Sequence, residues 1–341
     1  MPSSSMSAKY AIYKSDNEIR AKGPIGDDAP MRLRMEAFVK DLQKRICEGI
    51  EEMDGKGKFI RTEWQRPEHG GEGITCVMPG GDVMEKAGAA VSVVYSELSP
   101  EAVRQMREDR GRDIDVDGVV PFFVTGISLV MHAKNPNAPT VHLNYRYFEV
   151  MNPDGTPKLW WFGGGADLTP VYLYEEDAVY FHQIYKEGCD KIDKTLYPEL
   201  KKACDKYFWN GHRGEARGIG GVIFDDFNSR PAEEIFQLCK ELGNRFLPSY
   251  VPIVKKRNAM PFDDEMVRWQ QIRRGRYVEF NLIWDRGTKF GLATPCARVE
   301  SIMMTMPLTA RWEYMHEPEP GSREAELVEV LKNPRDWIPL K

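Results

Sequence analysis

The sequence predicts a single α+β domain built on a mostly antiparallel sheet with helices packed against it. Segments of strand-like composition are joined by connections too short for the crossover helices that parallel strands need. No repeat, low-complexity linker or change of composition divides the 341 residues. With 42% hydrophobic and 29% charged residues, the chain also has ample apolar material for one large core.

The chain begins with a polar segment and a helix. Residues 1–29 are polar and small, and we expect a loosely held N-terminal arm before a domain that spans 30–341. A helix is predicted over 31–53, because apolar residues recur there at steps of three and four, with Pro30 at its start and Gly55 past its end. The recurring residues are Met31, Met35, Phe38, Leu42, Ile46, Ile50 and Met53.

Strand-like segments follow this helix. Residues 57–65 alternate between polar and apolar side chains, and 72–78 and 90–95 are short β-rich runs. Residues 119–133 and 140–151 are two longer strand candidates, joined by a turn rich in proline and asparagine. These strands form the first part of the predicted sheet.

In the second half of the chain, strand-like and helical segments follow one another less regularly. A strand is expected at 159–162 and is ended by three glycines. Residues 175–209 and 232–247 have a helical pattern, with the β-rich run 221–227 between them.

The C-terminal part is expected to contribute two more strands and a last helix. The aromatic and β-branched segments 276–284 and 299–306 predict a late strand pair. A proline-rich stretch separates this pair from a terminal helix near 323–332.

The charge balance excludes several classes of partner. The formal net charge is -5, so the protein has no general attraction to nucleic acid or to an anionic membrane surface. No apolar run approaches the ~18 residues of a membrane-spanning helix. A binding site for an anionic ligand therefore needs arginines that are concentrated locally.

The cysteines and the N-terminus predict a cytoplasmic location. Six cysteines are scattered along the chain without a CxxC pair, which is typical of reduced thiols. The first residues contain no apolar core of a signal peptide, Asp16 and Glu18 argue against a transit peptide, and the C-terminus matches no peroxisomal signal.

One strand carries a row of polar side chains. A period of two places His142, Asn144 and Arg146 on the same face, and Ser128 and His132 join them if the two long strands pair. An imidazole, an amide and a guanidinium in line are typical of an anion-binding cleft. The alternative is a solvated sheet face, which more often carries Lys, Glu and Thr.

Two further clusters could carry chemistry. Asp285 and Arg286 follow the expected strand 276–284, where the carboxylate could act as a general base or orient the arginine. Asp167 follows the glycines 163–165, which would let a ligand approach the backbone. For each cluster, a turn in which the aspartate bonds its own backbone remains the alternative.

The spacing of the histidines does not predict a metal site. The four histidines concerned are His132, His142, His182 and His212, and none of them is in a helical HxxxH pair. The glycine clusters never spell GxGxxG between a strand and a helix, so nothing indicates a nicotinamide or flavin site.

Five long motifs resemble those of the oxygen-dependent coproporphyrinogen III oxidases. They are ISLVMHAKNPNAPTVHLNYRYF (127–148), WWFGGGADLTP (160–170), HRGEARGIGGVIFDD (212–226), YVEFNLIWDRGTKFGLATP (277–295) and ESIMMTMPLTARWEY (300–314). The resemblance runs in family order from about residue 31 to the C-terminus. It implies a large, flat antiparallel sheet flanked by helices on both faces, with 30–341 as the catalytic domain.

The resemblance also implies roles for individual residues. His142 would be the proton donor, Ser128 would contact the substrate, and Asp167, Asp285 and Arg286 would belong to the catalytic site. The substrate-binding residues would be Asn144, Tyr145 and Arg146 together with Cys296, Ala297 and Arg298. Only the arginine of this last triplet matches the family's Gly-Ser-Arg or Gly-Gly-Arg.

The implied activity is the oxidative decarboxylation of two propionates of coproporphyrinogen III to vinyl groups. The product is protoporphyrinogen IX, dioxygen is the acceptor, and CO2 and hydrogen peroxide are released. No organic cofactor is implied. The bacterial branch would use His132, His142, His182 and His212 for a divalent metal, whereas the context of Thr294 and Pro295 resembles the eukaryotic branch, which needs none.

Two other functions stay open at this point, a metal-dependent oxygenase that uses the histidines and a porphyrin carrier without turnover.

We also expect a homodimer. The segment 277–313 has more apolar side chains than one sheet face usually buries, and the family places its dimer contact there. The apolar residues are Tyr277, Phe280, Leu282, Trp284, Phe290, Ile302, Met303 and Met306.

Overall fold

The described residues build one long antiparallel sheet. The computed structural model describes residues 8–66, 70–99, 120–293 and 298–340. Seven strands pair in the order β1-β2-β3-β4-β5-β6-β9, and every neighbouring pair is antiparallel, as the sequence predicts. The strands are β1 (Ile60–Gln65), β2 (Gly71–Met78), β3 (Met84–Leu98), β4 (Val120–Ala133), β5 (Thr140–Met151), β6 (Pro157–Thr169) and β9 (Gly221–Phe227).

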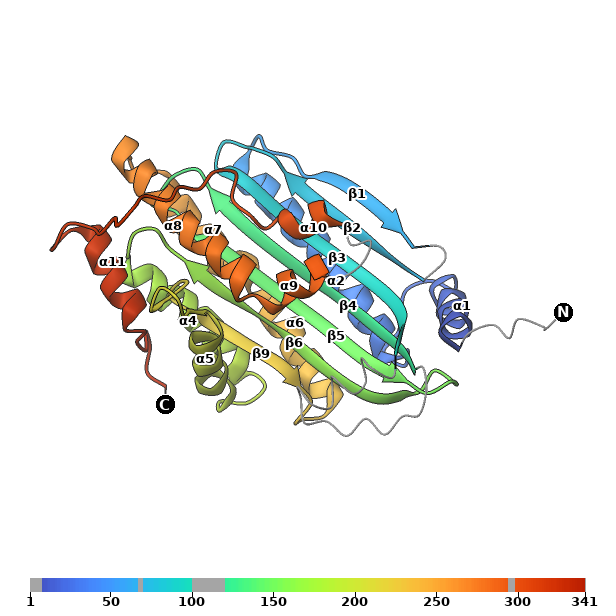
Figure 1. Cartoon of the computed structure of the whole chain (residues 1–341). Coiled ribbons are helices and arrows are strands. Elements are labelled where there is room, and N and C mark those ends of the chain that lie inside the picture. The colour runs from blue at the N-terminus through green and yellow to red at the C-terminus, as the bar shows by residue number, and fades with distance from the viewer. Residues whose placement is uncertain (1–7, 67–69, 100–119, 294–297, 341) are drawn as a thin grey trace.

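Helices lie on both faces of this sheet (Figure 1). One face is covered by α2 (Met31–Asp54), α6 (Ala232–Asn244) and α7 (Phe246–Asn258), and the other by α8 (Asp264–Ile283), α9 (Arg286–Ala293) and α10 (Val299–Met303). The other elements are α1 (Ala8–Arg20), α4 (Glu175–Asp190), α5 (Leu196–Tyr207), α11 (Arg323–Lys332) and the small hairpin β7 (Trp209–Asn210) and β8 (Glu215–Ala216).

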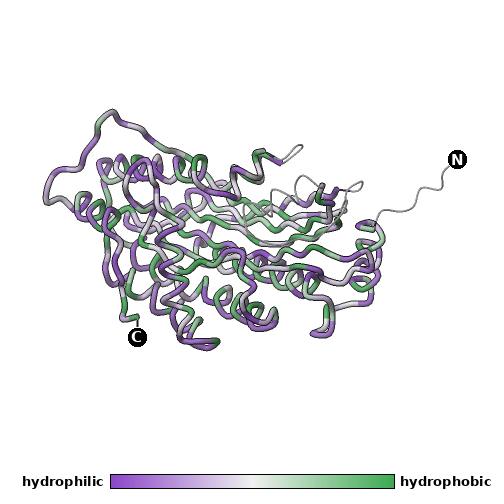
Figure 2. The backbone as a smooth tube through the Cα atoms, turned by 60° about the horizontal axis from the view of Figure 1, so that its bottom comes forward, coloured by the Kyte–Doolittle hydropathy of each residue, from purple (hydrophilic) through white to green (hydrophobic). Residues whose placement is uncertain are grey.

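The main core lies between the sheet and α2. Ile127, Leu129 and Leu143 are fully buried there, while the residues that alternate with them on β4 and β5 are only half-buried. In Figure 2, hydrophobic and hydrophilic residues alternate along the strands and the helices. The predicted alternation of β4 and β5 is therefore confirmed, and it leaves one polar sheet face partly open.

The predicted late strand pair is wrong, because both segments are helical. Residues 276–284 belong mostly to α8, in which Trp269, Arg273, Tyr277 and Phe280 recur at helical spacing and are all buried. Asp263 begins this helix by accepting a hydrogen bond from the Met266 amide at 2.9 Å. The aromatic residues that suggested a strand instead pack along one side of a helix.

Two other boundaries differ from the prediction. Strand β6 does not end at the glycines but continues to Thr169, since Gly163, Gly164 and Gly165 all pair with β5. The helical pattern at 175–209 is divided into α4 and α5, and α6 ends at Asn244 before α7 begins.

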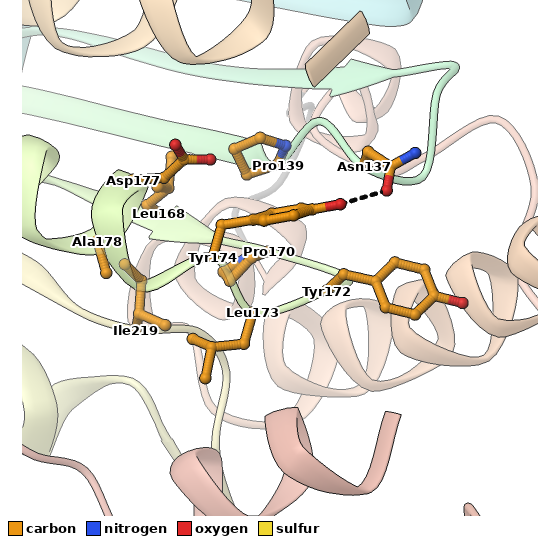
Figure 3. A pocket seen from close by; sticks show the side chains of 10 residues that line it. All are labelled: Asn137, Pro139, Leu168, Pro170, Tyr172, Leu173, Tyr174, Asp177, Ala178 and Ile219. Atoms are coloured by element: carbon orange, nitrogen blue, oxygen red, sulfur yellow. Dashed lines mark hydrogen bonds between the residues drawn. The ribbon is translucent and has the colours of Figure 1, made fainter. Parts of the chain in front are cut away.

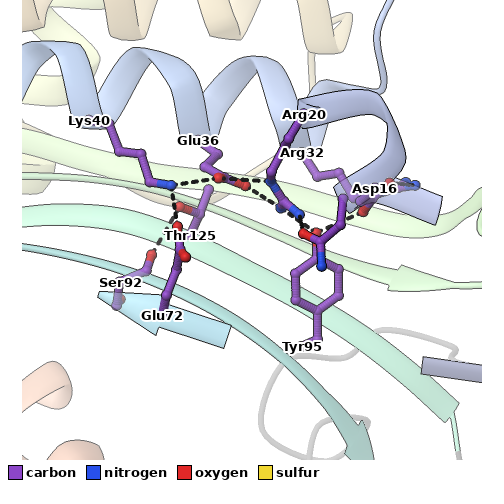
Figure 4. Close-up of polar contacts among 10 residues, drawn as sticks. Asp16, Arg20, Arg32, Glu36, Lys40, Glu72, Ser92, Tyr95 and Thr125 are labelled. Carbon is purple, nitrogen blue, oxygen red and sulfur yellow. Dashed lines mark hydrogen bonds and ion pairs between the residues drawn. The ribbon is translucent and has the colours of Figure 1, made fainter. Parts of the chain in front are cut away.

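The expected loose arm is a packed helix from Ala8 onward. Asp16 of α1 is fully buried and accepts hydrogen bonds from Arg32 at 2.7 Å and 2.9 Å and from Tyr95 at 2.7 Å. Arg20 donates to Glu36 at 2.6 Å (Figure 4). These ion pairs and the hydrogen bond from Tyr95 hold α1 against α2 and β3. The polar composition of the segment does not predict this packing.

No helix of the described part is long and apolar enough to span a membrane.

Candidate active site

Four of the predicted residues share the half-open sheet face. Ser128 of β4 lies opposite Asn144 of β5, and Arg146 and His142 follow on the same side of β5. All four are half-buried, in contrast to the intervening residues on the two strands. We call Ser128, His142, Asn144 and Arg146 the polar strip. It lies on the sheet face that α8, α9 and α10 cover in part (Figure 1).

Arg146 is held by an amide and a carboxylate. It donates to the Asn144 side-chain oxygen at 2.7 Å and forms an ion pair with Asp225 of β9. Asp225 also accepts a hydrogen bond from Arg286 at 3.2 Å. One carboxylate thus brings together two guanidinium groups that are far apart in the sequence, and both arginines keep exposed surface, at 36% and 72% of their side chains.

Gly163 makes room for the Arg146 guanidinium. A Cβ atom at this position would lie 2.7 Å from the Arg146 Cζ atom, closer than real contacts allow. Gly163 faces Arg146 across β5 and β6 in the sheet register. Gly163 therefore leaves space for the neighbouring arginine, and the strand does not end there.

His142 is the outer member of a buried polar chain. Its Nδ1 atom lies 2.8 Å from Asp167, whose carboxylate accepts two hydrogen bonds from Arg217 at 2.9 Å and 2.7 Å. Asp167 and Arg217 are 1% and 4% exposed, whereas 18% of the His142 side chain is exposed. The order of burial places the imidazole between the buried ion pair and the open face.

Asp167 is held in its charged form. Burial raises the pKa of this carboxyl group, but the positive charge of Arg217 and the hydrogen bond from His142 outweigh burial and bring the pKa below its usual value. An ionised carboxylate only accepts hydrogen bonds. His142 therefore carries its proton on Nδ1 in the neutral form, and its Nε2 atom takes no part in the contact with Asp167.

Arg217 is enclosed by aromatic rings. Its Cζ atom lies 4.0 Å from the ring centre of Phe208, 4.9 Å from that of Tyr277 and 4.8 Å from that of Phe280. Burial lowers the pKa of Arg217, and the Asp167 charge overcomes this and raises the pKa above its usual value. The pair is thus an ionic contact in an apolar environment.

Asp285 lies at the beginning of a helix. Its carboxylate accepts a hydrogen bond from the Thr288 amide at 2.7 Å, within the first turn of α9, and another from the Tyr207 hydroxyl at 3.0 Å. Burial and the nearby Asp285 charge raise the pKa of Tyr207. Asp285 thus bonds the nearby backbone, as in the turn that we gave as the alternative to a catalytic role. Arg286 is the next residue in the chain.

The other predicted substrate residues are not brought into the strip. The Tyr145 side chain is fully buried on the opposite sheet face, near Phe224, so it does not line the polar strip. This follows from the alternation of β5. Arg298 is exposed next to α10, and Cys296 and Ala297 lie outside the described residues.

The four histidines do not converge. His132 is buried between Thr140 and the Thr305 carbonyl group, His182 between Tyr197 and the Ile219 carbonyl group, and His212 bonds Glu279 and Trp284. Burial lowers the pKa of His132 to about 3 and that of His182 to about 4. Among the described residues, no group of three His, Cys, Asp or Glu side chains is arranged to hold a metal ion. The four histidines therefore do not fit one shared metal site.

A small cavity lies away from the strip, between the turn at Asn137 and the segment 168–178 (Figure 3). Its volume is about 10 Å³, about the space that one water molecule needs. The Tyr174 hydroxyl donates to Asn137 at its rim, at 2.6 Å. This cavity is too small for an organic substrate.

Reasoning from the sequence assigned no role in the site to Asp225 or Arg217. Both lie within the motif 212–226, but no periodic pattern distinguishes them there. Asp225 is 79 residues from Arg146 in the chain, and Arg217 is 50 residues from Asp167. Only the pairing of β9 with β6 brings these partners together.

Comparisons with known proteins agree with the motifs. A family model described as coproporphyrinogen III oxidase matches residues 34–337. The mitochondrial oxygen-dependent coproporphyrinogen-III oxidase of Homo sapiens is 53% identical over 309 residues, which are 90% of this chain and 67% of that protein. The oxygen-dependent coproporphyrinogen-III oxidase of Drosophila melanogaster is 52% identical over 319 residues, 93% of this chain and 81% of that protein. The chloroplastic enzyme of Glycine max is 50% identical over 312 residues, 90% of this chain and 80% of that protein.

Proposed function

Because the chain belongs to the coproporphyrinogen III oxidase family, we propose that it converts coproporphyrinogen III to protoporphyrinogen IX in haem biosynthesis. Two propionates are oxidatively decarboxylated to vinyl groups, and dioxygen is the acceptor. For each propionate, the bond to the carboxylate breaks, the β-carbon loses a hydrogen, and dioxygen takes up two electrons and two protons. The products besides the vinyl group are CO2 and hydrogen peroxide.

The observation that carries this proposal is the convergence of Arg146 and Arg286 on Asp225, on the same sheet face as His142. The substrate is a tetracarboxylate, and a guanidinium can bind a carboxylate through two parallel hydrogen bonds. Each such charge-assisted bond contributes roughly 1.5–3 kcal/mol. Local arginines thus supply the attraction that the negative net charge of the chain does not.

Proton transfer is assigned to His142. Asp167 accepts its Nδ1 proton, so the Nε2 atom is the one available to the substrate. Arg217 keeps Asp167 charged without touching the strip itself. Asn144 fixes the Arg146 guanidinium, and Ser128 and Asn144 add polar atoms beside it. Asp285 and Arg286 complete the site from α9.

The cofactors are proposed from the same chemistry. The electron-rich porphyrinogen itself reacts with dioxygen, so we assign no flavin, nicotinamide or divalent metal to the reaction. Support for the assignment without metal comes from the separate surroundings of the four histidines.

One experiment tests the function and separates its alternatives. Purified protein is incubated with coproporphyrinogen III in air, with and without a chelator, and the vinyl products and CO2 are measured. Turnover that is insensitive to the chelator is expected. Loss of turnover on chelation would indicate a metal-dependent oxygenase, and binding without CO2 release would indicate a carrier.

We also propose a homodimer whose interface lies within 277–313. Tyr277 and Phe280 are buried within the chain and are not available for it. Other apolar side chains of this stretch are at least 42% exposed, as expected of a contact surface: Leu282, Ile283, Trp284, Leu292, Val299, Leu308 and Trp312. A dimer by sedimentation at micromolar concentration is expected, and a monomer would contradict the proposal.

The cytoplasmic location stays a prediction. The relatives' own names include mitochondrial and chloroplastic enzymes. Cell fractionation with an antibody to the chain tests the location directly, and recovery in an organelle fraction would contradict the prediction.

A further inference from the structure

Helix α2 runs alongside β2 in the same direction. Lys40 of α2 lies 2.5 Å from the Glu72 carboxylate of β2 (Figure 4). One turn further along the helix, Gln43 donates to the Ile74 carbonyl oxygen at 2.9 Å, two residues further along the strand. About four helical residues cover the same distance as two strand residues. The next pair in this register is Cys47 and Cys76.

This register places Cys47 and Cys76 at the same level of the two elements. Cys47 is four residues after Gln43, and Cys76 is two residues after Ile74. The two residues are 8% and 5% exposed, and each acts on the pKa of the other more strongly than any other group does. Neither residue touches the polar strip, which lies on the opposite face of the sheet.

Arg61 distinguishes one thiol from the other. It is the cross-strand neighbour of Cys76 in β1, and its side chain donates hydrogen bonds to Glu63 in the same strand. The neighbouring Cys47 thiol and the charge of Arg61 lower the pKa of Cys76 to about 7, against the effect of burial. The pKa of Cys47 is raised, so Cys76 is the thiol that ionises.

The pair also lies near an accessible edge. Strand β1 is the edge strand of the sheet, and most of its residues are exposed, Ile60 to 62%. An edge strand opens locally more readily than a central one. In contrast, Cys189 and Cys239 are fully buried, and burial raises the pKa of both.

We propose that Cys47 and Cys76 are a peroxide-reactive thiol pair that closes reversibly into a disulfide. The Cys76 thiolate attacks hydrogen peroxide, the O–O bond breaks, and hydroxide leaves and takes up a proton, leaving a sulfenic acid. The Cys47 sulfur then attacks the Cys76 sulfur, the S–O bond breaks, and the hydroxyl group leaves with the Cys47 proton as water. Two thiols are oxidised by two electrons, and one peroxide becomes two waters.

The proposal for this thiol pair rests on the proposed function only for the source of the oxidant, hydrogen peroxide. Oxidative decarboxylation with dioxygen releases hydrogen peroxide, so this protein would be exposed to its own by-product. The chemistry of the pair itself can be tested without substrate, and failure of turnover would leave the result unaffected.

The test adds hydrogen peroxide to the fully reduced protein without air. Remaining thiols are then alkylated, and the digested peptides are identified by mass spectrometry. We expect one cross-linked peptide pair that joins Cys47 to Cys76, has lost two hydrogens and is separated by dithiothreitol. The variants Cys47→Ser and Cys76→Ser should lack it, and the matched control Cys239→Ser should keep it.

In Cys47→Ser, Cys76 should still be oxidised, and no partner thiol can then resolve the sulfenic acid. A dimedone adduct on Cys76 would show this. The proposal is overturned if both thiols stay alkylatable at peroxide concentrations that oxidise free glutathione. It is also overturned if the cross-link forms through a different cysteine.

Discussion

Arg217 and Asp167 form an ion pair at 2.7 Å in which the two side chains are only 2% and 1% exposed. The pair lies behind His142 and is surrounded by Phe208, Tyr277 and Phe280. Both charges are therefore removed from water and depend on each other, while His142 alone reaches the open face.

Because the two charges depend on each other, removing only one of them should lower the stability of the protein strongly. Arg217→Met leaves the Asp167 carboxylate buried and unpaired, which should lower the free energy of unfolding by roughly 3–5 kcal/mol. The double variant Arg217→Met/Asp167→Asn should recover much of that loss, because no charge is left uncompensated. Denaturant unfolding of the three proteins measures the difference. Equal stability of the single and double variants would contradict the pairing.

Asp225 occupies the two arginines to which we assign the substrate carboxylates. Asp225→Asn removes its charge and should lower the KM for coproporphyrinogen III by about three- to tenfold, or ~0.7–1.4 kcal/mol, because the substrate no longer competes with a protein carboxylate. Steady-state kinetics measure it. Asp193→Asn, at another aspartate that pairs with an arginine, is the matched control. A higher KM would mean that Asp225 positions the arginines instead.

Two neighbouring glycines should respond differently to alanine. At Gly163 the new methyl group meets the end of the Arg146 side chain, which can move, so folding should persist while turnover falls. At Gly164 it would lie 2.5 Å from the Asn144 carbonyl oxygen, which cannot move freely. Gly164→Ala should therefore cost stability, by ~1–3 kcal/mol. Thermal unfolding and kcat/KM of both variants test this difference. The same loss of stability and of turnover in both variants would argue that Gly163 has no special role beside Arg146.

His182 predicts a dependence of stability on pH. Its pKa is lowered to about 4 in the folded state, mainly by burial, so below its ordinary value of 6.5 the unfolded chain takes up a proton that the folded chain does not. Stability should fall as the pH falls from about 6.5 to 4, by at most ~1.4 kcal/mol per pH unit from this residue. His182→Gln should show a shallower decline in denaturant unfolding. The same slope in both proteins would be the contrary result.

Local patterns predict much of the fold, because the residues that define them are close in sequence. The alternation along β4 and β5 is enough to predict that Ser128, Asn144 and Arg146 share one face, and the strand register confirms it. The same alternation places Tyr145 on the opposite face, although the family resemblance names it among the substrate-binding residues. The helix around Tyr277 is mistaken for a strand, because aromatic residues suit both strands and packed helices.

The remaining parts of the site depend on distant contacts. Asp225 and Arg217 reach Arg146 and Asp167 only through the strand order of the sheet and the small hairpin before β9. The packed position of α1 likewise depends on Arg32 and Tyr95, which come from two different elements. No window of sequence contains both members of such a pair.

The central claim is that Arg146 on the polar strip binds a propionate of the substrate. Arg146→Lys keeps the charge but cannot form two parallel bonds, so kcat/KM with coproporphyrinogen III should fall about tenfold or more, ~1.4 kcal/mol per tenfold. Arg146→Ala should lose more, because the propionate would be left unpaired. Arg45→Lys, at an exposed arginine paired with Asp41, is the control. Values for both Arg146 variants within ~0.5 kcal/mol of the wild type would make the strip an ordinary sheet surface and contradict the account.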